Sequence, residues 1–360
     1  MKHQQVGSKD AVESLGQQSR FAELDCVKGI AILMVILIHA SDTVFSRNHD
    51  FDLEWFLAMV TTSLSRVCVP WFVIVSGFLV LNREKTASFR QFYCRRFTRI
   101  LCPFMFWLTV HILWRHFYQH EQLSVRQWLV QTVQGPVYYH LWFLYMIVGL
   151  YLAAPFLSRM LDNLNDRQVI LFLVLWFCLA ALLPWAEWLL EFDTKVPIGI
   201  FGSYFGYFLF GGWIRRLQVP HVVARICGGL SLVLVVLTIL GTTWISRRDG
   251  DLNQVFLAYL APNIVLLSLF SIIWLMRAQL SSVAVDRRML ATTILTVAGR
   301  NSFSIYGSHV LIMQLVGASL LPGSAIWPMQ FLMLGLLTAT LCFGLSGLLG
   351  KLPNLRWVTG

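Results

Sequence analysis

Long runs of apolar residues, separated by short polar segments, make up most of the chain from about residue 28 onward. Several runs exceed the ~20 residues that an α-helix needs to cross a bilayer. Helices are expected because backbone polar groups in hydrocarbon must be paired within the protein. The pattern predicts about ten transmembrane helices, roughly at residues 28–46, 56–81, 98–117, 138–158, 168–190, 198–214, 222–246, 254–276, 301–321 and 327–349.

Composition and charge support an all-α, polytopic integral membrane protein. Of 360 residues, 57% are hydrophobic and only 13% are charged, whereas a soluble domain carries about 25% charged residues. With ten spans and a cytoplasmic N-terminus, most Lys and Arg residues fall in cytoplasmic segments. Cytoplasmic loops carry an excess of Lys and Arg, so this orientation is favoured, and both termini are predicted to be cytoplasmic. The basic residues are spread over separate loops rather than one stripe, so they do not indicate a nucleic-acid partner.

The domain organisation is expected to be simple. Residues 1–22 are predicted to form a cytoplasmic tail, disordered to about Ser19, and residues 351–360 a second cytoplasmic tail. A single transmembrane domain, residues 23–350, lies between them. The seven cysteines include no CxxC motif, so neither a metal site nor a disulfide framework is predicted. The sequence lacks a P-loop, so ATP is not indicated as the energy source.

The first apolar run contains the strongest candidate for chemistry. In ELDCVKGIAILMVILIH, Lys28 and His39 are eleven positions apart, so a helix places them ~20° apart in azimuth and ~16 Å apart along its axis. An ionisable group deep in a membrane usually faces a bundle interior or a cavity, which favours a functional His39. Asp42 follows on the same face, where it can fix the histidine tautomer. The alternative is a histidine bonded to a neighbouring helix, with Asp42 only ending the helix.

Basic residues mark two further candidates. The segment FYCRRFTRI places Arg95, Arg96 and Arg99 at a cytoplasmic helix entrance, and guanidinium groups bind phosphate well. Such clusters also serve as topology signals and as contacts for anionic lipid. Arg66 lies within an apolar run, where it needs a polar ligand or a structural ion pair.

A polar stripe is predicted near the C-terminal end. In GRNSFSIYGSH, Ser302, Tyr306 and His309 share one face of a helix. The stripe either faces a cavity or forms hydrogen bonds between packed helices. His140 and Trp142, in YYHLWFL, are placed at an outer membrane edge, where an aromatic belt explains most of the pattern.

Five of these segments, read in order, resemble the membrane acyltransferase-3 family. More narrowly, they are similar to the inner-membrane O-acetyltransferases of bacterial surface polysaccharides, such as the one acting on enterobacterial common antigen. The resemblance covers residues 24 to about 310 and rests on LDCVKGIAILMVILIH, SRVCVPWFVIVSGFLVL, FYCRRFTRILCPF, YYHLWFLYMIVGLYLAAPF and GRNSFSIYGSH.

The resemblance implies a ten-helix bundle in the bacterial inner membrane that moves an acyl group, commonly acetyl from acetyl-CoA, to a carbohydrate hydroxyl. The acceptor would be a surface glycan or a lipid-linked sugar, with membrane lipids as further partners and no tightly bound cofactor. The first helix of the family carries an arginine and, eleven positions on, the catalytic histidine. That histidine corresponds to His39, and Lys28 stands in the arginine position. The family's basic run matches Arg95, Arg96 and Arg99.

These residues suggest a mechanism. The ~16 Å between Lys28 and His39 is comparable with an extended pantetheine arm. We expect the CoA phosphates at Lys28 and the arginine run, with His39 as general base. Arg66, Tyr306 and His309 are candidates for binding the substrate. No residue stands out as a nucleophile, which favours direct transfer, although a covalent acyl-enzyme remains open.

Two other classes of function fit some of the same residues. A transporter or flippase for a polar lipid or sugar would also place ionisable side chains inside the membrane. It would move its substrate unchanged, whereas an acyltransferase consumes acyl-CoA and releases free thiol. A non-catalytic assembly factor would tolerate changes at both His39 and Arg66.

Overall fold

The computed structural model describes residues 2–48, 50–81, 88–192, 204–281, 290–320 and 329–359. Every regular element in these ranges is a helix, which confirms the all-α prediction. The elements are α1 (Lys2–Phe45), α2 (Leu53–Ser65), α3 (Cys68–Val80), α4 (Phe89–Arg96), η1 (Phe97–Leu101), α5 (Cys102–Phe117), α6 (Val125–Gln134), η2 (Tyr139–Leu141), α7 (Trp142–Asn163), α8 (Asp166–Phe177), η3 (Cys178–Leu182), α9 (Leu183–Leu190), α10 (Phe205–Ile214), α11 (His221–Asp249), α12 (Pro262–Ser281), α13 (Leu290–Arg300), α14 (Ser302–Leu320), α15 (Gln330–Lys351) and η5 (Arg356–Thr359).

Seven helical segments of the described chain are long and apolar enough to cross a membrane. They are Ala22–Phe45, Leu53–Val80, Phe89–Phe117, Tyr139–Asn163, Asp166–Leu190, His221–Asp249 and Gln330–Lys351, and two shorter apolar helices are Phe205–Ile214 and Pro262–Arg277. The protein is therefore a multi-pass membrane protein. The count of ten spans and the cytoplasmic termini stay predictions. Parts of three predicted spans, 198–214, 301–321 and 327–349, lie outside the described residues.

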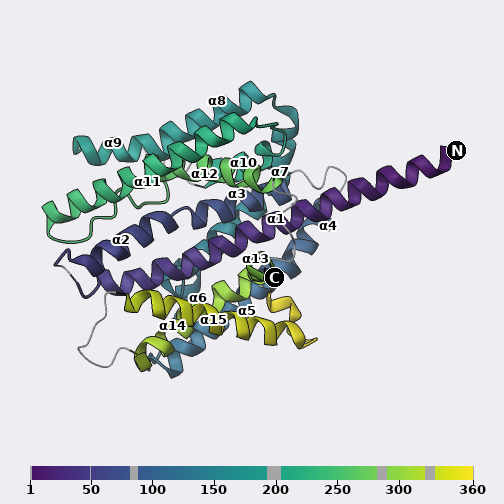
Figure 1. The fold of residues 1–360 in the computed structure, drawn as a ribbon. Coiled ribbons are helices and arrows are strands. Elements are labelled where there is room, and N and C mark those ends of the chain that lie inside the picture. The colour runs from purple at the N-terminus through teal and green to yellow at the C-terminus, as the bar shows by residue number, and fades with distance from the viewer. Residues whose placement is uncertain are drawn as a thin grey trace.

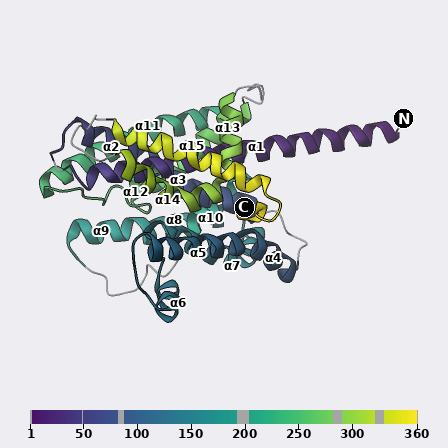
Figure 2. The same cartoon turned by 90° about the horizontal axis from the view of Figure 1, so that it is seen from below.

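The helices pack as a bundle around α1. This helix contacts α2, α3, α13, α14 and α15, and Figure 1 shows it running through the middle of the molecule. In Figure 2, α5, α7 and α9 form a second row beside α1, α2 and α15, and α6 projects away from the bundle. Because α1 carries Lys28 and His39, its central position places both residues inside the protein.

The N-terminal segment differs from the prediction. Residues 2–21 are not a disordered tail but continue α1 as one helix, which extends away from the bundle (Figures 1 and 2). The segment contains no proline, and it has four Gln and two Lys residues, which favour helix. Extending an existing helix also avoids the unfavourable nucleation step.

The predicted span 56–81 is interrupted rather than continuous. Helix α2 ends at Ser65, and α3 begins at Cys68. Pro70 explains the break, because a proline ring clashes with the carbonyl group four residues earlier in a regular helix. That carbonyl belongs to Arg66, which lies at the break.

Two glycines bring α1 and α13 into close contact. A Cβ atom on Gly29 would clash with the carbonyl oxygen of Leu295, and one on Gly299 would clash with the carbonyl oxygen of Asp25. Small residues at such crossings let helix backbones approach closely in membranes. The approach places the start of the α1 span beside the end of α13.

Candidate functional site

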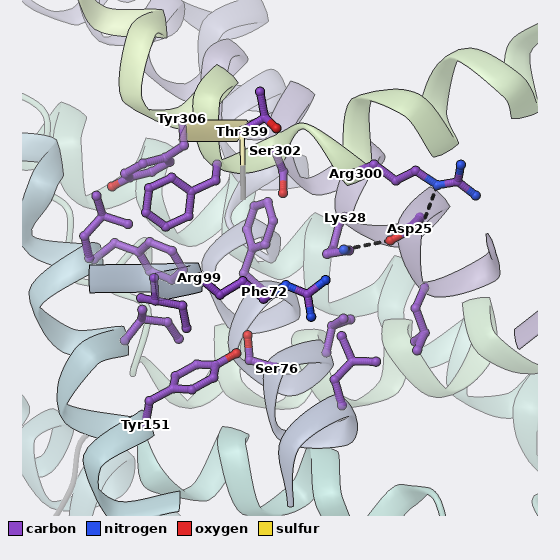
Figure 3. Close-up of a pocket in the computed structure, with 18 of the residues that line it drawn as sticks. Asp25, Lys28, Phe72, Ser76, Arg99, Tyr151, Arg300, Ser302, Tyr306 and Thr359 are labelled. Carbon is purple, nitrogen blue, oxygen red and sulfur yellow. Dashed lines mark hydrogen bonds and ion pairs between the residues drawn. The ribbon is translucent and has the colours of Figure 1, made fainter. Parts of the chain in front are cut away.

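A cavity of about 560 Å³ lies between α1, α3, η1, α7 and α14. Figure 3 shows Lys28, Asp25 and Arg300 on one side of it and Tyr306 on the other. Most of the remaining lining is apolar. The polar residues that line the cavity are Asp25, Lys28, Ser76, Arg96, Arg99, Tyr151, Arg300, Ser302, Tyr306 and Thr359.

Positive charge dominates the polar lining of the cavity. Four basic side chains face one carboxylate, that of Asp25. The Lys28 Nζ atom is 2.7 Å from one Asp25 oxygen, and the Arg300 Nε atom is 3.1 Å from the other. The guanidinium of Arg96 lies 5.4 Å from the centroid of the Tyr151 ring, and its Nε atom is buried without a hydrogen-bond partner in the described chain. The cavity is therefore suited to an anion.

The local helix geometry places two arginines of the basic run in this cavity. Helix α4 ends at Arg96 and continues directly as the π-helical turn η1, which contains Arg99. Such turns inside helices are frequent at functional sites. Arg96 and Arg99 both line the cavity together with Lys28, whereas Arg95, which the sequence groups with them, is not among the lining residues.

Tyr306 connects the cavity to a second group of polar side chains. It lines the cavity with Ser302 from the same face of α14. Its ring centroid is also 5.4 Å from that of His309 and 5.5 Å from that of His140. Its hydroxyl group donates a hydrogen bond to the His140 carbonyl oxygen. The predicted stripe on α14 therefore runs from the cavity into this second group.

The second group is a cluster of four histidines, called the histidine cluster below: His39, His111, His140 and His309. Ring centroids are 5.2 Å apart for His39 and His309, 5.0 Å for His140 and His309, and 5.0 Å for His111 and His140. Helices α1, α5 and α14 and the turn η2 each contribute one ring. His111, His140 and His309 are each at most 2% exposed.

His39 is oriented by Asp42. The His39 Nδ1 atom lies 3.3 Å from Asp42 Oδ2, as the shared helix face predicts. A carboxylate accepts hydrogen bonds, so this contact assigns the proton to Nδ1 and leaves Nε2 with a free lone pair. The His39 side chain is 16% exposed, and that of Asp42 is 44% exposed. This geometry equips His39 to accept a proton.

The sequence analysis missed three residues of these sites. His111 lies within the predicted span 98–117, so the argument that singled out His39 applies equally to it. The aromatic-belt interpretation of His140 was wrong, because this residue is 2% exposed and packs against three other histidines. Arg300 was not singled out from the sequence, because its place in the cavity lining depends on how α13 packs against α1.

Arg66 lies elsewhere. It is 8% exposed, its guanidinium is 5.3 Å from the Tyr259 ring centroid, and its Nε atom has no hydrogen-bond partner among the described residues. It is not among the residues that line the cavity. The described residues also contain no group of three or more His, Cys, Asp or Glu residues placed to hold a metal ion.

Comparisons with known proteins give the family of the chain. Part of the chain is 31% identical over 97 residues to "Nodulation protein NolL" of Sinorhizobium fredii, a match that covers 27% of this chain and 26% of that protein. No solved structure matches the chain. The sequence profile of the acyltransferase-3 family, described as an acyltransferase domain, matches residues 21–347. This match covers most of the chain, which therefore belongs to the acyltransferase-3 family of membrane acyltransferases.

Proposed function

We propose that this acyltransferase moves an acetyl group from acetyl-CoA to a hydroxyl group of a bacterial surface glycan or a lipid-linked sugar, in the inner membrane. One observation carries the proposal. Tyr306 lines a cation-rich cavity, and its ring also lies beside His140 and His309 of the histidine cluster, which contains the Asp42-oriented base. This arrangement joins a site for an anionic donor to a site for proton transfer.

The cavity is suited to the donor. Coenzyme A carries phosphate groups, which form strong charge-assisted hydrogen bonds with guanidinium and ammonium groups. Arg96, Arg99, Lys28 and Arg300 supply these groups, and the apolar lining suits the pantetheine arm. Lys28 and His39 lie on the same continuous helix, so the helical rise separates them by ~16 Å. That spacing supports a thioester placed near His39 while the phosphates remain in the cavity.

The chemistry follows from the tautomer of His39. Its Nε2 atom takes the proton from the acceptor hydroxyl group, whose oxygen attacks the thioester carbonyl carbon. The carbon–sulfur bond breaks, and coenzyme A leaves as a thiol after its sulfur takes up a proton. Asp42 holds the Nδ1 proton. A positioned base contributes about 10²–10⁴-fold to such a rate.

The transporter hypothesis has no comparable support. Family membership indicates a transferase, and a transporter gives no reason for a base held by a carboxylate beside an anion-binding cavity. Arg66 stands outside the scheme, because it contacts Tyr259 rather than the cavity lining.

The proposal is tested in membranes that contain the wild-type protein or His39→Ala at matched levels. The acceptors are envelope glycans from which base has first removed the existing O-acetyl groups. Release of free thiol from acetyl-CoA and incorporation of labelled acetyl into these glycans are measured together. We expect both to depend on the wild-type protein and to be lost in His39→Ala. His116→Gln is the matched control, because His116 bonds to the Glu121 carbonyl outside the cluster. Full transfer by His39→Ala, or no acetyl-CoA turnover by the inserted wild-type protein, would contradict the proposal.

A further inference from the structure

The histidine cluster contains polar atoms that the described protein does not satisfy. The Nε2 atoms of His111 and His309 and both ring nitrogens of His140 are buried without a hydrogen-bond partner among the described residues. Each buried, unpaired polar group costs about 1–3 kcal/mol. Such groups are rare, and each calls for a physical reason. Four of them gathered in one cluster point to a ligand that pairs with them.

The hydrogen-bonding pattern defines which groups that ligand carries. The Nδ1 atoms of His111 and His309 lie 2.8 Å and 2.6 Å from the carbonyl oxygens of Trp107 and Tyr306. A carbonyl oxygen only accepts, so both Nδ1 atoms carry the proton and both Nε2 atoms are acceptors. His39 presents an acceptor Nε2 for the same reason. His140, as a neutral ring, offers one donor and one acceptor.

Because the cluster presents mainly hydrogen-bond acceptors, it favours a ligand that carries hydrogen-bond donors. Carboxylate and phosphate oxygens only accept when ionised, so they would meet lone pairs rather than protons in this cluster. Hydroxyl groups both donate and accept, and two adjacent hydroxyl groups can pair with neighbouring imidazoles. The matching ligand is therefore a neutral polyol rather than an anion, in contrast to the ligand of the cavity.

We propose that His111, His140 and His309 form the acceptor subsite, which binds adjacent hydroxyl groups of a neutral sugar and presents one of them to His39. This inference rests on the proposed function and specifies its acceptor class. The three residues are positioning residues, and His39 alone takes the proton.

Two exposed residues lie beside the cluster. Tyr139 lies against both His39 and His140, with ring centroids 5.4 Å and 5.5 Å apart, and it is 57% exposed. Asp42, beside His39, is also exposed. The acceptor therefore enters past Tyr139, while the donor approaches from the cavity, past Tyr306.

The test uses the purified full-length chain in nanodiscs, with acetyl-CoA as donor. The acceptor probes are methyl glycosides of glucose, galactose and N-acetylglucosamine, with methyl glucuronide as the anionic counterpart. The variants are His140→Leu, which removes both nitrogens, and His140→Gln, which restores a donor and an acceptor. His116→Leu is the matched control outside the cluster. Acceptor KM, acetyl-CoA KM and the thermal unfolding midpoint are measured for each.

We expect transfer to the neutral glycosides and weaker transfer to the glucuronide. His140→Leu should raise the acceptor KM at least tenfold, the loss expected for one buried hydrogen bond of about 1.4 kcal/mol, and leave the acetyl-CoA KM unchanged. His140→Gln should recover part of the loss. The unfolding midpoint of His140→Leu should equal or exceed that of the wild type, because an unpaired buried group is replaced by an apolar one.

Each contrary result has a distinct meaning. An unchanged acceptor KM in His140→Leu, preference for the glucuronide, or a loss of folded His140→Leu protein would overturn the acceptor subsite. Turnover of acetyl-CoA without transfer to any neutral glycoside would overturn it as well. Absence of all acetyl-CoA turnover by the folded wild type would instead overturn the proposed function.

Discussion

The cavity and the histidine cluster both border Tyr306, yet they are built from different chemistry. The cavity carries Lys28, Arg96, Arg99 and Arg300, balanced only by Asp25. The cluster contains imidazoles, three of them almost completely buried. Permanent charges bind an anionic ligand, whereas neutral rings can hold hydroxyl groups and move a proton. The cavity is therefore suited to bind the donor, and the histidine cluster is suited to the proton transfer.

Burial explains why the two regions could not exchange roles. A guanidinium group remains charged in a protein, so placing it deep in a membrane is costly without a partner. Imidazole can be buried as a neutral ring that still forms hydrogen bonds. His111, with its Nδ1 atom bonded to the Trp107 carbonyl oxygen, shows this arrangement.

The largest effect is expected from His39→Gln, which removes the base from the histidine cluster and leaves the cavity unchanged. We expect kcat to fall by about 10²–10⁴-fold, because the base is lost, while the dissociation constant for acetyl-CoA stays the same. Single-turnover transfer and equilibrium binding of labelled acetyl-CoA measure the two quantities separately. If donor binding were lost as well, the division of labour between the regions would be wrong.

The next largest effect is expected from Arg96→Gln in the cavity. Loss of a charge-assisted hydrogen bond to phosphate, worth about 1.5–3 kcal/mol, should raise the acetyl-CoA KM by about 10–100-fold. The matched control is Arg95→Gln, which removes the adjacent arginine outside the cavity lining. Equal effects of the two changes on the acetyl-CoA KM would show that the run acts through general charge rather than through the cavity.

Asp42→Asn is expected to have a smaller effect, of about tenfold on kcat. An asparagine amide can donate a hydrogen bond to Nδ1, which would favour the tautomer with its proton on Nε2 and weaken the base. Asp42→Glu keeps a carboxylate and should retain more activity. The pair is compared in the same transfer assay, and equal activity of Asp42→Asn and wild type would remove Asp42 from the mechanism.

The smallest change is expected for Lys28→Arg, which keeps the positive charge and has the side chain that the family resemblance implies at this position. We expect the acetyl-CoA KM to stay within about threefold of the wild type, less than 1 kcal/mol. Lys28→Met, which removes the charge, should raise it further. Indistinguishable KM values for wild type, Lys28→Arg and Lys28→Met would show that Lys28 does not contact the donor.

Features set by a single helix could be predicted from the sequence. The shared face of His39 and Asp42, and that of Tyr306 and His309, follow from helical periodicity. The family resemblance grouped Lys28 with Arg95, Arg96 and Arg99; in the structure Lys28, Arg96 and Arg99 line one cavity, and Arg95 does not. The functional roles of these residues stay predictions.

Features set by packing between distant segments could not be predicted in the same way. His111 and His140 meet His39 only because α5 and η2 pack near α1, and no periodicity reports that contact. Arg300 reaches Asp25 because Gly29 and Gly299 let two helix backbones approach. By contrast, Pro70 indicates an irregular helix from the sequence alone, since the clash of a proline with the preceding turn is local. The structure places the break at Arg66, between α2 and α3.

The position of Tyr306 has a consequence for the membrane as an electrical insulator. The polar cavity and the imidazole rings of the histidine cluster could together conduct protons if the side chain of Tyr306 did not lie between them. Tyr306 is 6% exposed and bonded to the His140 backbone, so it closes that path while the protein is at rest. We expect that replacing it with glycine would let protons leak across the bilayer, visible as dissipation of an imposed pH gradient in liposomes.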